Sequence, residues 1–205
     1  MFAINLRVEF CYYEKVANSA PVLLDNLPFD IPDSWEWARL EQVVMVNPRN
    51  IVEDEIDVSF VEMKSLRGEF NNSFDFEPRK WKSIKIGFTH FRDEDVGFAK
   101  ITPCFQNRKS AVFHNLLNSY GAGTTELHIL RAYPNTIIPE YILWFVKSPY
   151  FIEWGKQNFS GTAGQQRFGT EDVKKTLIPI PPLNEQIEIV MKIKQVLLSV
   201  EKDEN

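Results

Sequence analysis

The sequence predicts an α+β domain followed by a long C-terminal helix of the coiled-coil type. Two observations carry this prediction. Short stretches that alternate apolar and polar residues are interspersed with helical stretches up to about residue 181,. After Pro182, apolar residues recur at helical spacing instead,. We therefore divide the chain into an N-terminal segment and connector (1–33), a domain (34–182) and a terminal helix (183–205).

Four stretches are expected to form strands because large apolar residues alternate with polar ones. Ahead of them, prolines punctuate the connector at Pro28 and Pro32, which favours a folded segment that begins near Ser34,. Residues 7–13 alternate only weakly and fit either a short strand or a helix. The four expected strands are residues 35–40, 58–63, 96–101 and 127–131,.

Helices are expected in the second half of the chain. Pro139 suits the first position of a helix, and Glu140 suits its positive end,. Ser148-Pro149 should end this helix, and a second short helix should follow over 150–158. Asn184 is a candidate N-cap for the terminal helix, which would be roughly 28 Å long at about 1.5 Å per residue,.

The terminal helix carries two apolar rows. Together they make a broader apolar face than one domain surface needs, which favours pairing with another helix or subunit,. The alternative is a helix folded back on its own domain. One row is Ile187, Val190, Met191, Leu197 and Leu198, and the other is Ile189, Ile193, Val196 and Val200. The residues expected to bind the partner are Ile187, Val190, Met191, Ile193, Leu197 and Leu198.

Composition indicates an ordinary globular protein of 205 residues, with 44% hydrophobic and 25% charged residues,. No stretch reaches the roughly 18 apolar residues of a membrane span, and the first residues lack a signal-peptide pattern,. The two cysteines show no spacing pattern, so neither a disulfide scaffold nor a cysteine zinc site is expected,. We expect a cytoplasmic protein without a metal or cofactor, since the three histidines show no ligand spacing.

Charge is distributed unevenly along the chain. The formal net charge of −5 does not indicate a nucleic-acid binder, but residues 79–109 hold eight basic and three acidic residues, a local charge of +5,. Acidic residues concentrate elsewhere in the sequence, at 53–57 and 201–204. The basic stretch predicts a DNA-binding face, and the alternative is an ordinary solvated surface.

Three groups of residues are candidates for DNA contacts. Lys100, Arg108 and Lys109 flank a Thr-Pro turn, where cations suit phosphates,. The glycine-rich loop 161–167 lacks the Gly-Lys-Ser/Thr ending of a nucleotide-binding loop and is either a DNA-contacting loop or a structural turn,. Its candidate contacts are Gln165, Gln166 and Arg167, and the candidate base-reading residues are Arg79, Lys80, Lys82 and His90,.

Taken in order, several strings resemble the specificity subunit of type I restriction–modification systems. They lie at residues 31–37, 58–63, 98–104, 107–109, 123–128, 161–168 and 178–186. The resemblance implies a non-catalytic target-recognition domain that reads one half of a split site in duplex DNA, followed by a conserved-region helix. It also implies partners, namely a methyltransferase subunit and, through the complex, a restriction subunit.

Members of this family usually carry two domain-plus-helix units, whereas this chain has one. The resemblance therefore implies a half-subunit, a product of gene splitting or a piece cut from a longer chain. A half-subunit would form a homodimer or join a second half, and no membrane partner is expected. Two strings depart from the family pattern. Glu94-Asp95 stands where a Gly-Asp pair is common, and Gln106-Asn107-Arg108-Lys109 stands where Glu-Asn-Gly-Lys is common. The second change removes a turn glycine and adds a positive charge.

Two other functions remain open from the sequence. Asp57, Glu62 and Lys64 resemble the metal-dependent site of a small nuclease, in which carboxylates hold the ion and lysine steadies the nucleophile,. The second open function is a protein-interaction module that is built around the terminal helix and makes no DNA contact. The recognised bases do not follow from the sequence, because readout also depends on loop geometry and DNA shape.

Overall fold

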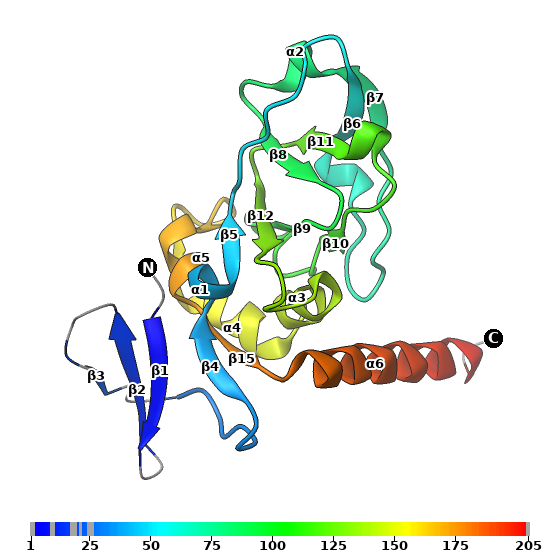
Figure 1. The fold of residues 1–205 in the computed structure, drawn as a ribbon. Helices are drawn as coiled ribbons and strands as arrows, with labels where there is room; N and C mark the ends of the chain where they lie inside the picture. Colours follow the sequence, from blue (N-terminus) through cyan, green and yellow to red (C-terminus); the bar gives the residue numbers. More distant parts are fainter. Residues whose placement is uncertain (1–2, 9–10, 17–19, 21, 24–26, 204–205) are drawn as a thin grey trace.

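The computed structural model describes residues 3–8, 11–16, 20, 22–23 and 27–203 (Figure 1). The N-terminal segment forms a three-stranded antiparallel sheet, in which β1 pairs with β2 from Ala3↔Val16 to Val8↔Cys11. The open choice between strand and helix for this segment is therefore decided in favour of strands. They are β1 (Ala3–Val8), β2 (Cys11–Val16) and β3 (Val22–Leu23). Met1 and Phe2, which begin the stretch without a signal-peptide pattern, lie outside the described residues. So do residue 204 at the end of the acidic tail and the side chain of Cys11.

Two four-stranded sheets form the frame of the remaining chain, one above the other in Figure 1. The first has the order β10-β9-β12-β5, and all its pairs are antiparallel. The second has the order β7-β6-β11-β8, with β6 and β11 parallel. Their strands are β5 (Val44–Val46), β6 (Asp57–Val61), β7 (Glu77–Lys80), β8 (Thr89–Arg92), β9 (Val96–Ala99), β10 (Ser110–Val112), β11 (Tyr120–Gly123) and β12 (Leu127–Ala132).

Short elements complete the domain. The strand pairs are β4 (Glu36–Arg39) with β15 (Leu177–Ile180), and β13 (Phe159–Ser160) with β14 (Arg167–Phe168). The helices are α1 (Leu40–Val43), α2 (Trp81–Ile84), α3 (Pro139–Val146), α4 (Pro149–Gln157) and α5 (Thr170–Lys175), with 3-10 turns η1 (Met63–Ser65) and η2 (Leu117–Ser119).

All four expected strands are confirmed, as β4, β6, β9 and β12, and both expected central helices are confirmed as α3 and α4. Proline decides the break between the two helices. Ser148 caps α4 by accepting a hydrogen bond from Phe151 N at 3.2 Å, and Pro149 follows as its first residue,. The boundaries proposed at residues 33 and 182 stay predictions.

Aromatic side chains dominate the main core, which lies between the first sheet and the helices. Phe151 packs edge-on against Phe98 and Phe168, with ring centroids 5.3 and 5.7 Å apart. A second cluster fills the space between the sheets, where the rings of Phe91 and Phe113 stack at 3.9 Å. Gly121 makes room for this stack, because a Cβ there would lie only 2.2 Å from the Phe91 ring. The domain is thus held by apolar burial on both sides of the first sheet.

The terminal helix α6 (Leu183–Asp203) begins two residues before Glu185, which would be its first residue if Asn184 were the N-cap. Asn184 is therefore not the N-cap. Gln186 N donates to Pro182 O at 3.0 Å, which closes the first turn around Pro182. The buried Gln186 amide also bonds Ile138 N, Thr136 O and Pro181 O, so it anchors the start of α6 to the domain. The helix departs from the domain at a point fixed by these bonds.

The first half of α6 packs on α3, whereas its second half extends beyond the domain (Figure 1). Val190 is 5% exposed and belongs to the domain core, so its assignment to a partner-binding face is wrong. Ile187, Met191 and Leu198 are exposed, while Ile193 and Leu197 are partly covered. The first half of the helix therefore folds back on its own domain, whereas pairing of the second half with another helix stays a prediction. Within residues 27–203 and the described strands before them, no helix is long and apolar enough to cross a membrane.

Candidate nucleic-acid interface

The basic stretch 79–109 does not form one positive face. Antiparallel pairing of β6 with β7 places Asp57 opposite Lys80, and this register brings the acidic segment 53–57 against the basic one. Four cations are thereby paired: Arg79 with Glu77 at 2.9 Å, Lys80 with Asp57 at 3.0 Å, Lys82 with Glu55 at 2.8 Å and Lys85 with Asp54 at 2.8 Å. The acidic segment 53–57 is separate from the basic stretch in the sequence, but the fold places the two side by side. The expectation of one positive face is therefore wrong. These exposed pairs are each worth about 0–1 kcal/mol, but they cancel the local charge.

The side chains of Arg108 and Lys109 bond to other residues of the domain. Arg108 Nε donates to Lys147 O at 3.0 Å, and Arg108 Nη1 lies 3.1 Å from Glu69 Oε2. Lys109 Nζ donates to Met63 O at 2.9 Å. These bonds tie the start of β10 to α3 and η1, which gives both residues a structural role that does not need DNA.

Lys147 completes this junction as a buried cation. Its ammonium donates to Glu69 O at 2.8 Å and to Arg108 O at 2.9 Å. Burial lowers the pKa of Lys147 to about 8,. The Lys147 ammonium is therefore buried and bonded within the domain.

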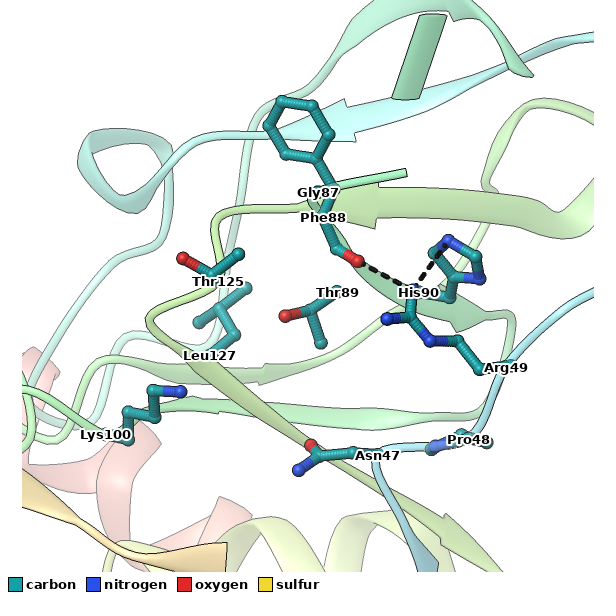
Figure 2. A pocket seen from close by; sticks show the side chains of 10 residues that line it. All are labelled: Asn47, Pro48, Arg49, Gly87, Phe88, Thr89, His90, Lys100, Thr125 and Leu127. Carbon is teal, nitrogen blue, oxygen red and sulfur yellow. Dashed lines mark hydrogen bonds between the residues drawn. The ribbon is translucent and has the colours of Figure 1, made fainter. Parts of the chain in front are cut away.

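Lys100 lies apart from these groups, on the rim of a cleft of about 270 Å³ (Figure 2). The cleft is bordered by the loop after β5, the start of β8, the end of β9 and the turn before β12. It is lined by Asn47, Pro48, Arg49, Gly87, Phe88, Thr89, His90, Lys100, Thr125 and Leu127. The Lys100 side chain has no hydrogen bond or ion pair with any residue in the described part of the chain. It is thus the cation of the predicted set that is available to a ligand.

Arg49 faces Lys100 across the cleft (Figure 2). Its Nη1 donates to Phe88 O at 3.0 Å and lies 3.2 Å from His90 Nε2. Thr89 projects between the two cations in the same view. Arg49 lies outside the basic stretch, so counting charge along the sequence missed it. The available signal was Asn47-Pro48, a turn pair directly after an apolar strand,.

Asn47 builds the turn that presents Arg49. It adopts a left-handed backbone with φ of 52°, which asparagine tolerates better than most residues,. Its Oδ1 accepts from Ile129 N at 3.0 Å, and its Nδ2 donates to His128 Nδ1 at 3.1 Å. His128 in turn donates from Nε2 to Phe168 O at 2.8 Å, and burial lowers its pKa to about 4. The floor of the cleft is therefore a neutral, fully bonded layer.

His90 is 4% exposed, although it was a candidate for reading bases. Asn50 N donates to its Nδ1 at 3.2 Å, so the neutral ring carries its proton on Nε2, which donates to Lys85 O at 3.0 Å. Burial lowers the pKa of His90, which keeps the ring uncharged beside Arg49,. Both ring nitrogens are thus occupied within the domain, and His90 supports the wall of the cleft.

The glycine-rich loop adjoins Lys100. Phe168 N donates to Lys100 O at 2.9 Å, and Thr102 N donates to Gln166 O at 3.0 Å. Gly161 and Gly164 have φ of 107° and 83°, so glycine is needed at both turns,. The loop is a defined turn whose Gln165 side chain is exposed and whose Gln166 side chain is half-buried.

Arg167 is bonded to Glu126 through two parallel contacts, Nε to Oε2 at 2.9 Å and Nη2 to Oε1 at 2.8 Å. These hydrogen bonds lower the pKa of Glu126, which stays ionised and paired,. Arg167 is therefore less available to DNA than the sequence suggested. Its pairing also neutralises the carboxylate beside Lys100, and this keeps the cleft positive.

The nuclease site is not assembled. Asp57 begins β6 and Glu62 follows its end, so their Cα atoms lie roughly 16 Å apart at about 3.3 Å per residue,. Asp57 is paired with Lys80, and Glu62 is paired with Lys64 at 2.6 Å. No group of three His, Cys, Asp or Glu among the described residues could hold a metal ion. The hypothesis of a magnesium site at Asp57 and Glu62 is wrong.

Comparisons with known proteins agree with the resemblance. Residues 32–205 match the family model described as the type I restriction modification DNA specificity domain. The Escherichia coli type I restriction enzyme EcoAI specificity subunit is 42% identical over 174 residues, which cover 84% of this chain and 30% of that protein. The EcoEI specificity subunit of the same organism is 38% identical over 188 residues, which cover 90% of this chain and 32% of that protein.

Solved structures agree at the level of the fold. The HsdS subunit from Thermoanaerobacter tengcongensis superposes with a TM-score of 0.70 at 22% identity, covering 85% of this chain and 45% of that chain. A chain from a structural study of complex assembly and conformational transition in the type I R-M system superposes with a TM-score of 0.72, also at 22% identity, covering 86% and 45%. The chain thus spans about a third of the curated relatives and less than half of the solved chains.

Proposed function

Since the chain belongs to the family of type I restriction modification DNA specificity domains, we propose that it is a non-catalytic unit that selects the DNA sequence on which a type I restriction–modification enzyme acts. The family match over residues 32–205 supports a recognition role for the domain and the terminal helix together. The unit would read one half of a split site. The methyltransferase and restriction subunits would supply the chemistry.

The single structural observation behind this proposal is the cleft between Arg49 and Lys100. It provides two cations that form no ion pair among the described residues, on a surface framed by both sheets, and the nearby Glu126 carboxylate is paired with Arg167. DNA needs such groups because phosphate contacts set the orientation of a protein on the duplex. The exposed Gln165 side chain on the neighbouring loop is a candidate for base edges,.

The other predicted contacts take secondary places in this proposal. Arg79, Lys80 and Lys82 would reach phosphates only by exchanging their carboxylate partners. Arg108, Lys109 and Arg167 would act through the loops that they hold together. The affinity of the isolated chain should therefore be low, because few cations are free. It should fall with salt, because the contacts are made to phosphates.

We propose that the exposed face of α6 pairs with a second helix in coiled-coil fashion. Ile187, Met191 and Leu198 are exposed on a helix that extends beyond its own domain. The second helix would belong to another copy of this chain or to a second half-subunit, and the pair would set the spacing between half-sites. A homodimer would read a symmetric site, and the complex would act on DNA in the cytoplasm.

The function is tested by co-purification with the cognate methyltransferase subunit and sequencing-based mapping of methylated DNA. We expect a stable complex that methylates one split site. Lys100→Glu should lower DNA affinity and methylation, whereas Lys156→Glu on α4, outside the cleft, should not. A complex whose DNA affinity is untouched by Lys100→Glu would favour the interaction-module hypothesis. A chain that neither binds that subunit nor directs methylation would overturn the proposal.

A further inference from the structure

We infer that the cleft between Arg49 and Lys100 binds one phosphate group of the DNA backbone, and that both side chains contact this same phosphate. The inference rests on the proposed function, and it assigns to this cleft the orienting contact rather than base recognition. Figure 2 shows the Lys100 amine and the free edge of the Arg49 guanidinium entering the cleft from opposite sides, with the Thr89 hydroxyl between them.

The side-chain groups that remain free in the cleft can all donate hydrogen bonds, and the threonine hydroxyls among them can also accept,. The Lys100 amine has no hydrogen bond or ion pair among the described residues, although the nearby Glu126 carboxylate attracts it. Arg49 uses Nη1 toward Phe88 O and leaves the rest of its guanidinium open. Thr89 and Thr125 can add hydroxyl donors,. A phosphodiester presents only acceptors and a negative charge, so it complements this set completely.

Groups that could read a base edge are already used. The amide of Asn47 bonds both Ile129 N and His128, and both nitrogens of His90 are bonded. The nearest carboxylate, Glu126, is held by Arg167. A base pair in the major groove presents acceptors together with donors. Of the free side chains in the cleft, the two threonine hydroxyls can meet a donor, whereas both cations can only donate, so the charge of the cleft favours a phosphate,.

The cleft is also preorganised for its ligand. The carbonyl of Phe88 fixes the Arg49 guanidinium, so little side-chain freedom is lost on binding,. The ring of His90 is uncharged, so it adds no positive charge beside Arg49. The volume of about 270 Å³ lies just below the roughly 300 Å³ at which small-molecule sites begin,. That space suits a phosphate with its flanking sugar atoms better than a cofactor.

Methylphosphonate scanning tests the inference in the complex with the methyltransferase subunit. Each phosphate of the recognised DNA is replaced singly by a neutral methylphosphonate, and affinity is measured for the wild type, Arg49→Gln, Lys100→Gln and the double variant. We expect one position per recognition unit where neutralisation weakens wild-type binding about tenfold. The same replacement should have little further effect on the double variant, because coupled groups are not additive.

The salt dependence gives a second, independent readout. One shared phosphate predicts that the double variant lowers the slope of log affinity against log salt by about 0.9, whereas two separate phosphates predict about twice that value. Lys156→Gln, which removes an exposed cation on α4 outside the cleft, should retain the position-specific methylphosphonate effect. Thermal melts of each variant confirm that it is folded.

Three outcomes would overturn the inference. Arg49→Gln or Lys100→Gln could change the methylated sequence, which would make the cleft a base-reading site. Scanning could reveal no position coupled to these residues. The double variant could lower the slope of log affinity against log salt by about twice 0.9, the value expected for two separate phosphates. In each case the wild type would still select its site, so the proposed function would survive. A wild type without sequence selection would instead overturn both.

Discussion

Arg131 holds Asp95 through two parallel hydrogen bonds, with Nε 2.8 Å from Oδ1 and Nη2 2.7 Å from Oδ2. The Asp95 side chain is 1% exposed and that of Arg131 is 15% exposed. Arg131 Nη2 also donates to Asn50 Oδ1 at 2.9 Å, and Asn50 Nδ2 donates to Phe91 O at 2.8 Å. The pair therefore joins β12, the turn before β9 and the loop that carries Arg49.

Asp95→Asn should destabilise the domain strongly. It leaves the Arg131 guanidinium buried without a countercharge, a change that typically costs about 3–5 kcal/mol,. The free energy of unfolding from urea titration measures this loss. Glu77→Gln, which breaks an exposed ion pair, should cost less than about 1 kcal/mol,. Equal losses in the two variants would contradict the role given to Asp95.

Glu94→Gly should stabilise the domain. Glu94 has φ of 70°, a left-handed conformation that costs a residue with a Cβ about 1–2 kcal/mol relative to glycine,. The resemblance places a glycine at this position in the family. Glu94 contacts only the exposed His114 through its carboxylate, at 3.0 Å, so little is lost. Glu94→Gln keeps the backbone cost and should leave the urea midpoint almost unchanged.

Arg108→Gly should give no comparable gain, although Arg108 also replaces a family glycine at φ of 52°. The arginine side chain repays its backbone cost through the bonds to Lys147 O and Glu69. Hydrogen bonds from a charged donor contribute about 1.5–3 kcal/mol, which offsets the glycine effect. We expect the unfolding free energy of Arg108→Gly to lie at least about 1 kcal/mol below that of Glu94→Gly. The reverse order would contradict this account.

Stability should fall between pH 6.5 and pH 4 through His128. Burial lowers its folded pKa to about 4, whereas an unfolded histidine titrates near 6.5,. Below pH 6.5 the unfolded chain therefore binds a proton that the folded chain excludes, and this costs about 3 kcal/mol by pH 4. His128→Gln should show a shallower decline in unfolding free energy over this window. An unchanged slope would place the acid sensitivity in other groups.

Introducing a carboxylate should have different effects on the exposed face and on the buried face of α6. Met191 is 55% exposed, so Met191→Glu should preserve the thermal melting point of the isolated chain but weaken self-association, as measured by sedimentation. Val190→Asp should lower the melting point instead, because it buries an unpaired carboxylate in the core,. Unchanged self-association in Met191→Glu would argue against helix pairing through this face.

Elements with a local signature were predictable from the sequence. Strands β4, β6, β9 and β12 alternate, and α3 and α4 are bounded by prolines. Each signal acts within a few residues, so neighbouring residues are enough to read it. The family resemblance depends on the order of such strings, and the comparisons support it. The N-terminal sheet lacked a clear local pattern and was left open.

The state of each charged side chain was decided only by tertiary structure. Lys80 and Lys100 belong to the same basic stretch, yet strand pairing places Lys80 against Asp57 and leaves Lys100 in the cleft. Partners for His90 and Arg49 come from segments some 40 residues away, at Asn50 and Phe88. Charge neutralisation and burial depend on distances in space, and spacing along the chain does not encode them. The sequence by itself therefore determined the family and the elements with a clear local pattern, whereas the fold decided which cations can meet DNA.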